Sequence, residues 1–224
     1  MAFLAGMGGV HLAAGLRWIS EGRGGFLAAF VLSRPPRLRM AAGGGWGPFI
    51  DGGATWRIWT SVLVHVDALH LGMNAVAIAV LGRMLEPLFG AWRFAAIAWA
   101  GGVAGALASH GVGNLQSDGA SGAGFALMGA GLVTGLRHRR ALPAEDARFL
   151  GPVLGAFIAL NLALSVVLPF IDLTAHAGGL AAGVLLGIWP GTRRTAALDA
   201  ADRAWVLLSV AICGWGWWRV FGPR

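Results

Sequence analysis

Long apolar runs separated by short polar segments dominate this chain. A helix needs about 20 predominantly apolar residues to cross the hydrocarbon core of a bilayer. Six runs approach or reach that length, near residues 60–82, 92–110, 120–136, 150–170, 174–190 and 204–221. We therefore expect a transmembrane helix in each of these six regions.

A seventh run, near residues 2–19, gives a weaker signal because it is short, rich in glycine and interrupted by His11 and Arg17. Residues 20–59 form a long connection that contains two adjacent prolines, three consecutive glycines and three tryptophans. That composition is typical of a loop or an interfacial segment lying at the membrane surface. The pattern thus predicts a weak first span, a long first loop and six further spans.

The composition agrees with an integral membrane protein. Of the 224 residues, 57% are hydrophobic and 12% are charged, whereas soluble domains carry about 25% charged residues. The net charge of +7 comes with 17 basic residues, all of them arginine. Because no basic patch is interleaved with aromatic residues, we attribute this charge to membrane topology and expect no nucleic-acid partner. The single cysteine, Cys213, cannot form an intrachain disulfide, and no cleavable signal peptide is recognisable at the N-terminus.

Arginine follows the second, fourth and sixth spans, whereas the loops at 111–118 and 169–173 carry none. Short arginine-bearing loops stay on the cytoplasmic side of a membrane. This rule predicts that residues 60–70, 111–121 and 170–176 lie at or just below the outer face, although the long first loop also carries arginine. The arginines used for this assignment are Arg83, Arg93, Arg137, Arg139, Arg140, Arg148, Arg193, Arg194 and Arg203.

The second span reads TSVLVHVDALHLGMNAVAIAVLG and contains several polar side chains. Intramembrane polar groups are costly and usually have a function. A helix turns about 100° per residue, so His70 and Asn74 share one face, one turn apart. On the same helical wheel His65 lies nearly opposite Asn74, and we interpret His65 as a structural residue.

A single serine, Ser121, stands among glycines where the fourth span begins, in the stretch GASGAGFALMGAG. The sixth span has His176 near its start, followed by a G-x-x-x-G pair at 179–183 that allows another helix to approach closely. Packing of these two small-residue faces would place Ser121 beside His176, and a neighbouring imidazole makes serine a nucleophile. The free N–H groups at the start of the fourth span, with His70 and Asn74, would then stabilise an oxyanion.

Each of these residues has a simpler explanation when taken alone. A serine in a glycine-rich helix is usually a packing residue, and a single intramembrane histidine can bond a carbonyl or line a pathway. A metal site at His65, His70 and His176 is disfavoured, because no HExxH motif is present and because His65 and His70 should point apart. We expect no metal and no cofactor. The joint presence of nucleophile, base and donors at one membrane depth favours catalysis.

Together these motifs resemble the rhomboid family of intramembrane serine proteases. The resemblance extends over residues 45–190, and its elements occur in the family's order on separate spans. Each element is weak alone, but the combination is specific. The matching segments are HVDALHLGMN at 65–74, GASG at 119–122 and AHAGGLAAG at 175–183, together with Trp56, Arg57 and Glu86.

The resemblance implies an all-α polytopic membrane fold with a rhomboid-like six-helix core over residues 1–190, including the first loop at 20–59. Residues 191–224 would then supply a cytoplasmic loop and an additional C-terminal transmembrane helix.

The resemblance also implies a catalytic dyad of Ser121 as nucleophile and His176 as general base. His70, Asn74 and the Ser121 amide would form the oxyanion hole. Gly119 and Phe125 would support the site and the bound substrate. Phe125 stands where the family often has tyrosine, so it keeps the stacking surface against His176 and loses the hydroxyl.

The implied function is that of a serine endopeptidase that cleaves single-pass transmembrane proteins where small or helix-breaking residues loosen the helix. Its partners would be such substrates and the lipid bilayer, and the sequence gives no oligomeric state. The composition indicates a bacterial inner membrane, with the site open to the periplasmic or extracellular side.

Two other classes of function remain open at this stage. A catalytically inactive rhomboid-like protein would bind transmembrane helices without cutting them, and a small transporter or channel would use histidine and asparagine to line a pathway. Asp172 has two readings as well: it caps the sixth span, which we favour, or it assists His176 as a third triad member.

Overall fold

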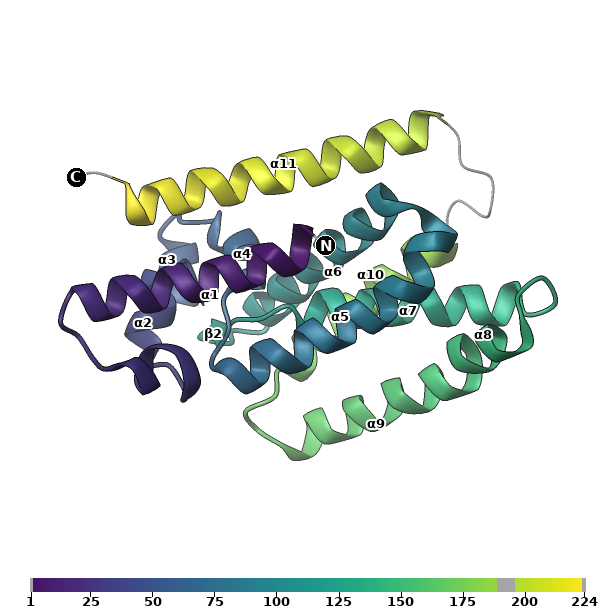
Figure 1. Ribbon diagram of the computed structural model, residues 1–224, viewed down its shortest axis with the longest axis horizontal. Coiled ribbons are helices and arrows are strands. Elements are labelled where there is room, and N and C mark those ends of the chain that lie inside the picture. The colour runs from purple at the N-terminus through teal and green to yellow at the C-terminus, as the bar shows by residue number, and fades with distance from the viewer. Residues whose placement is uncertain (1, 189–195, 223–224) are drawn as a thin grey trace.

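The computed structural model describes residues 2–188 and 196–222, and these residues form a helical bundle (Figure 1). Within these described residues, five helical segments are long and apolar enough to cross a membrane, and a further apolar helix is shorter. The expected all-α polytopic membrane fold is confirmed. The main helices of the bundle are α1 (Ala2–Ser20), α5 (Ala68–Phe89), α6 (Ala91–Gly111), α7 (Ser121–Arg137), α9 (Leu154–Val167), α10 (Leu173–Ile188) and α11 (Ala196–Phe221).

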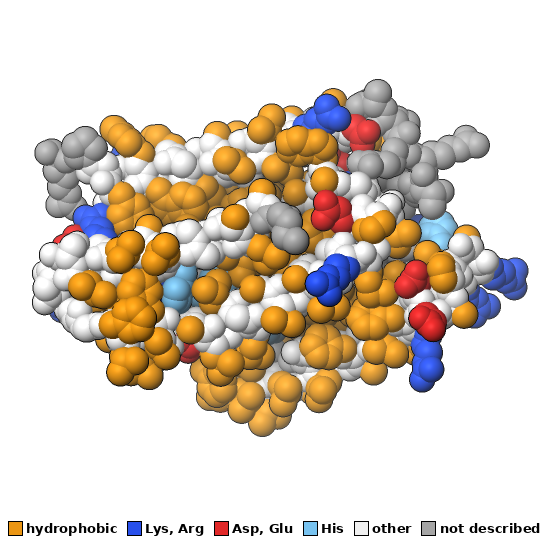
Figure 2. Space-filling model, in the orientation of Figure 1, with side chains coloured by type: hydrophobic (Ala, Val, Ile, Leu, Met, Phe, Trp, Pro, Cys, Tyr) orange, Lys and Arg blue, Asp and Glu red, His pale blue; other side chains and the backbone are white. Residues whose placement is uncertain are grey.

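The centre of the bundle is formed by α6, α7 and α10, which contact one another more extensively than any other helices. In Figure 1, α11 runs along one edge of the molecule and α9 along the opposite edge. Many side chains of α7 are fully buried, whereas α9 exposes large apolar residues such as Phe157, Leu160 and Val166. Exposed apolar side chains cover much of the visible face (Figure 2), as expected for a surface in contact with lipid.

The weak N-terminal run is a complete helix, α1, which buries one stripe of residues against the bundle. The predicted start of the second span, near residue 60, is wrong, because α5 begins at Ala68. The Asp67 side chain caps this helix by accepting a hydrogen bond of 2.7 Å from the His70 backbone N–H. Residues 61–63 before it form a separate 3₁₀ turn, η2 (Ser61–Leu63).

The long first loop is folded. Its short elements are η1 (Leu27–Val31), α2 (Pro36–Ala41), β1 (Gly45–Trp46), α3 (Gly47–Asp51) and α4 (Arg57–Thr60). The remaining short elements of the described chain are β2 (Gln116–Ser117), α8 (Ala144–Arg148) and η3 (Phe149–Val153).

The first loop is joined to the segment that leads into α7. Strands β1 and β2 pair in antiparallel fashion, with Gly45 opposite Ser117. The fully buried Asp118 carboxylate accepts hydrogen bonds from the Gly45 N–H at 2.8 Å and from Arg39 at 3.1 Å. The loop and the approach to Ser121 therefore form one structural unit.

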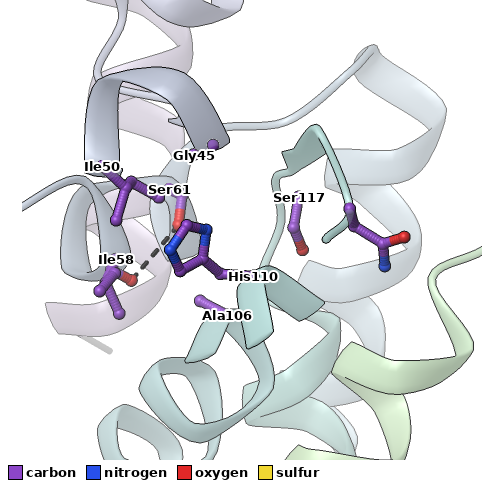
Figure 3. Close-up of a pocket in the computed structure, with 9 residues that line it drawn as sticks. Gly45, Ile50, Ile58, Ser61, Ala106, His110 and Ser117 are labelled. Atoms are coloured by element: carbon purple, nitrogen blue, oxygen red, sulfur yellow. Dashed lines mark hydrogen bonds between the residues drawn. The ribbon is translucent and has the colours of Figure 1, made fainter. Parts of the chain in front are cut away.

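A cavity of about 10 Å³ lies beside this pairing, between the first loop and the end of α6 (Figure 3). Ser61 and Ser117 line it, and so does His110, whose Nε2 lies 3.2 Å from Asp51 Oδ1. That volume holds about one water molecule, so the loop sits closely on the bundle.

The arginine-bearing ends of the helices meet at one end of the bundle. Arg93, near the start of α6, pairs with Asp202 of α11 at 2.9 Å and donates to the Leu186 carbonyl of α10 at 2.7 Å. Arg137, at the end of α7, donates to the Ile188 carbonyl at 3.1 Å. This agrees with the prediction that these helix ends lie on the same side of the membrane. Arg193, Arg194 and the expected boundary between residues 190 and 191 lie outside the described residues.

Candidate active site

The turn before α7 requires glycine at position 119. Gly119 has φ of +124°, which L side chains rarely adopt, and a Cβ there would lie 2.5 Å from His70 Cε1. Its N–H donates to the Ser61 carbonyl at 3.0 Å. The turn therefore brings the backbone just before Ser121 against the imidazole of His70.

His65 and His70 lie beside each other, so the expectation that they point apart is wrong. Their ring centroids are 5.2 Å apart in an edge-to-face arrangement. The helical-wheel argument failed because His65 precedes α5, which starts at Ala68. His65 is fully buried, and its Nε2 accepts a long hydrogen bond of 3.4 Å from the Ala120 N–H. It thus supports the turn before Ser121, in keeping with a structural part.

The small-residue faces of α7 and α10 pack together as the sequence predicts. A Cβ on Gly179 would clash with the carbonyl oxygen of Gly122, and one on Gly183 would clash with the backbone of Ala126. Gly105 of α6 approaches the same place, since a Cβ there would lie 2.6 Å from the Ala175 carbonyl oxygen. Three backbones therefore converge beside Ser121 and His176, an approach that larger side chains would prevent.

Ser121 is the first residue of α7, so the amide groups of the first turn have no acceptor within the helix. The Phe125 ring, one turn later, stacks on the His176 ring at a centroid distance of 4.2 Å and an interplanar angle of 22°. Ser121 thus lies one turn from the ring that contacts the imidazole. Between these two described residues there is no hydrogen bond: the imidazole is bonded elsewhere.

The hydrogen-bond partner of His176 is Ser165 of α9. Ser165 Oγ lies 2.9 Å from His176 Nδ1, and both side chains are buried. The Ser165 hydroxyl also donates to the Asn161 carbonyl at 2.7 Å. A hydroxyl has one hydrogen, so Ser165 Oγ accepts from Nδ1–H, and Nε2 of the imidazole keeps its lone pair.

The sequence prediction missed Ser165. A signal was available, because Asn161 and Ser165 are polar residues one turn apart in the apolar run FIALNLALSVVL. Asn161 donates back to the Phe157 carbonyl within α9 and is half-exposed. Which of the two faces the bundle is decided by the rotation of α9, which the sequence does not give.

His70 and Asn74 lie one turn apart on α5, as predicted. The Asn74 Nδ2 donates to the His70 carbonyl at 2.9 Å. Nδ2 carries two hydrogens, so this bond leaves one for another acceptor. The His70 imidazole lies against Gly119, so its ring faces the turn that leads into Ser121.

Asp172 caps α10, as we favoured, and is not bonded to His176. Its carboxylate accepts from the Ala175 N–H at 3.0 Å, the capping position, and receives further side-chain donors from α6, from the loop between α6 and α7, and from α10 itself. Burial raises the pKa of this carboxyl, but the hydrogen bonds outweigh burial and hold the pKa below its ordinary value. The side-chain donors are Ser109, Asn114, Ser117 and Thr174.

The lowered pKa of Asp172 predicts an acid-sensitive fold. A carboxyl with a depressed folded pKa stabilises the protein above its ordinary pKa of about 3.9, and that stabilisation disappears as pH falls through the lowered value. We expect Asp172→Asn to lower the melting temperature at pH 7 and to flatten its decline between pH 5 and pH 3. The exposed Glu145→Gln serves as control. An unchanged acid limb in Asp172→Asn would refute the stabilising role of the ionised carboxylate.

Within residues 2–188 and 196–222, no group of three or more His, Cys, Asp or Glu side chains is arranged to hold a metal ion. His65 and His70 are close, but His176 is bonded to Ser165 and stacked on Phe125. The arrangement instead offers a hydroxyl, an oriented imidazole and free backbone amides, the components of nucleophilic acyl transfer.

Comparison with known proteins identifies a rhomboid domain over residues 52–192. Rhomboid protease GluP of Bacillus subtilis (strain 168) is 30% identical over 171 residues, which is 76% of this chain and 33% of the relative. RHOMBOID-like protein 6, mitochondrial, of Arabidopsis thaliana is 35% identical over 63% of this chain and 46% of the relative. Human Rhomboid-related protein 3 is 29% identical over 59% of this chain and 36% of its own length. The chain therefore spans between a third and a half of the length of these relatives.

Proposed function

Because the chain belongs to the rhomboid family, we propose that it is an intramembrane serine endopeptidase that cleaves single-pass transmembrane proteins. Ser121 is the nucleophile and His176 the general base. The observation that carries this proposal is the way His176 is held at the start of α7, stacked on Phe125 and bonded through Nδ1 to Ser165. In that arrangement the Nε2 of His176 keeps its lone pair and can accept the proton of Ser121.

The reaction proceeds by acyl transfer. Ser121 Oγ attacks the scissile carbonyl while Nε2 of His176 takes the hydroxyl proton, and the resulting imidazolium then protonates the leaving amine. Water, activated by the same Nε2, hydrolyses the acyl-enzyme and releases the second fragment. The Ser121 amide, the His70 imidazole and the remaining Asn74 N–H stabilise the oxyanion in both steps.

The hydrogen bond between Ser121 and His176 forms when substrate binds. Catalytic hydrogen bonds are often long in free enzymes and shorten in the complex. A substrate helix must also unwind to reach Ser121, because a peptide bond in a regular helix is shielded. Gly119 and Gly122 are packed against His70 and Gly101, whereas Gly124 in the first turn of α7 has open space beside it.

The site belongs on the periplasmic or extracellular side of a bacterial inner membrane in this proposal. The support is that the arginine-bearing ends of α6, α7, α10 and α11 meet at the opposite end of the bundle. The six-helix core over residues 1–190, with α11 added to it, stays our prediction for the domain organisation.

Ser165 is proposed as a positioning residue for His176. We expect Ser165→Ala to lower kcat about tenfold, with KM little changed, because the imidazole loses the hydrogen bond that fixes its tautomer. Ser165→Thr keeps the hydroxyl and should restore most of the rate. The measurement is kcat and KM for both variants at equal melting temperature. A full rate in Ser165→Ala would show that Phe125 stacking alone orients the base.

The function is tested with purified protein reconstituted in liposomes together with a single-span substrate that carries tags at both ends. Two fragments should appear, and mass spectrometry should place the cut in or near the span. A fluorophosphonate should also phosphonylate Ser121 Oγ, with loss of fluoride. Stable binding of the substrate without cleavage would instead favour a helix-binding protein, and solute flux without cleavage would favour a channel.

A further inference from the structure

A second polar cavity, of about 430 Å³, lies where α1, the first loop and α11 come together. The ends of the two helices are joined there, since Arg17 donates to the Val220 carbonyl at 2.7 Å and its guanidinium lies 5.0 Å from the centre of the Phe221 ring. Both helices are candidate membrane spans. The cavity therefore sits at a membrane interface, at the end of the bundle that holds the first loop.

The charge of the cavity is strongly positive. Its lining includes four arginines, Arg17, Arg23, Arg57 and Arg219, against one carboxylate, Glu21. Glu21 is shared by Arg17 at 2.7 Å and Arg23 at 2.8 Å. No ion pair within the described chain neutralises Arg57 or Arg219.

Arg57 is held rigidly at the cavity wall. One guanidinium nitrogen donates to the carbonyls of Met40 and Gly44, and the group stacks on Phe49 and Trp56, each at 4.7 Å. Its Nε is buried and has no hydrogen-bond partner within the described residues. Burial lowers the pKa of Arg57, which the charge of Asp118 partly opposes. Arg57 therefore places a fixed positive charge at the cavity wall, and such a charge attracts an anion.

Arg219 belongs to α11, and its guanidinium lies 5.5 Å from the centre of the Trp215 ring. Trp215 and Trp56 both line the cavity. Tryptophan is enriched at the headgroup level of membranes. In the turns leading to the cavity, α1 exposes Leu12, Leu16 and Ile19, which offer acyl chains an apolar surface.

We propose that this cavity binds the phosphate of an anionic phospholipid, with Arg57 and Arg219 as its principal ligands. Arginine binds phosphate through paired N–H donors, and basic pockets between transmembrane helices bind anionic headgroups on the cytoplasmic side of other proteins; here the same chemistry lies at the end that holds the first loop. The lipid would fix the end of α11 to the first loop. This site is independent of the proposed proteolytic activity.

The test compares the delipidated protein in phosphatidylcholine nanodiscs with and without phosphatidylglycerol. We expect phosphatidylglycerol to raise the melting temperature of the parent. Arg219→Gln should lose most of this gain and bind the lipid about tenfold more weakly, as expected for one charge-assisted hydrogen bond. The matched control is Arg203→Gln, at the other end of α11 and stacked on Trp92, which should behave as the parent.

An equal gain in all three proteins would overturn the proposal, because it would reflect general attraction to a negative surface. The absence of a gain in the parent would overturn it too. Inorganic phosphate in phosphatidylcholine nanodiscs distinguishes the source of the ligand: an equal gain there would mean a soluble anion site. Native mass spectrometry of the parent should retain phosphatidylglycerol in preference to phosphatidylcholine, a measurement that holds even if Arg219→Gln fails to fold.

Discussion

Replacing Ser121 with alanine should abolish cleavage, with a fall in kcat of about 10⁴-fold or more. Without the nucleophile no acyl-enzyme forms, and only the small contribution of substrate binding and the oxyanion hole to direct hydrolysis by water remains. The fold should be preserved, because Ser121 makes no side-chain hydrogen bond within the described residues and alanine is a good helix former. The measurement is fragment yield in liposomes, with thermal unfolding of both proteins as the check on folding.

The matched control is Ser209→Ala. Ser209 is a fully buried serine of α11 whose Oγ has no hydrogen-bond partner within the described chain. Its loss should leave cleavage unchanged. If Ser121→Ala cleaved as fast as the parent, the activity would come from a contaminant or from another residue, and the assignment of Ser121 would be refuted.

Replacing Gly183 with alanine should destabilise the bundle by about 3 kcal/mol and remove activity with it. A Cβ at this position would meet the Ala126 carbonyl oxygen and Cα of α7, and backbone atoms cannot move aside as a flexible side chain can. Forcing extra volume into a tight core costs about 1–3 kcal/mol, and here it would push α7 and α10 apart. The measurement is the thermal unfolding and cleavage rate of the purified variant.

Gly214→Ala is the matched control, because it makes the same glycine-to-alanine change at a position with free space. Gly214 lies in α11, and a Cβ there would meet no atom within 4 Å. Alanine is favoured over glycine in a helix by about 1 kcal/mol, so this variant should be as stable as the parent or more so. A Gly183→Ala protein with unchanged stability would mean that α7 and α10 are not in the close contact described.

Most of the long apolar helices and the packing of α7 on α10 were predictable because both rest on patterns local to one helix. Apolar runs of sufficient length and glycines four residues apart do not depend on the rest of the fold. The packing of α7 on α10 followed from glycines such as Gly179, and the cap of α10 followed from Asp172.

The predictions failed where a local break in the helix mattered. Apolar residues continue from residue 60 into α5, so hydropathy gives no reason to end the loop at Asp67. The Asp67 cap does end it, and the wheel angle assigned to His65 was wrong for that reason. The short elements of the first loop have two to six residues each, too few to show a periodicity. Part of this loop is held by a distant residue, Asp118, which bonds Arg39 and Gly45.

The role of Ser165 could not be predicted from the sequence for a different reason. Its role depends on α9 standing beside α10 with one particular rotation, and the apolar composition of α9 allows any rotation in a lipid environment. Two residues that are eleven positions apart and on separate helices meet through packing alone. A polar residue in an apolar span is a signal that some partner exists, but the sequence does not identify that partner.

The position of α11 in the chain also determines the order in which contacts between the helices form during translation. At one end α11 supplies Asp202 to Arg93 of α6, and at the other it supplies Val220 to Arg17 of α1. Trp217, on the same helix, donates to the Ala42 carbonyl in the first loop at 3.2 Å. Because a ribosome makes α11 after the helices that it contacts, the Asp202 ion pair forms only after the start of α11 has been translated, and the bonds of Trp217 and Val220 form after its last turns. The earlier helices insert and pack first, and α11 then joins them from the outside.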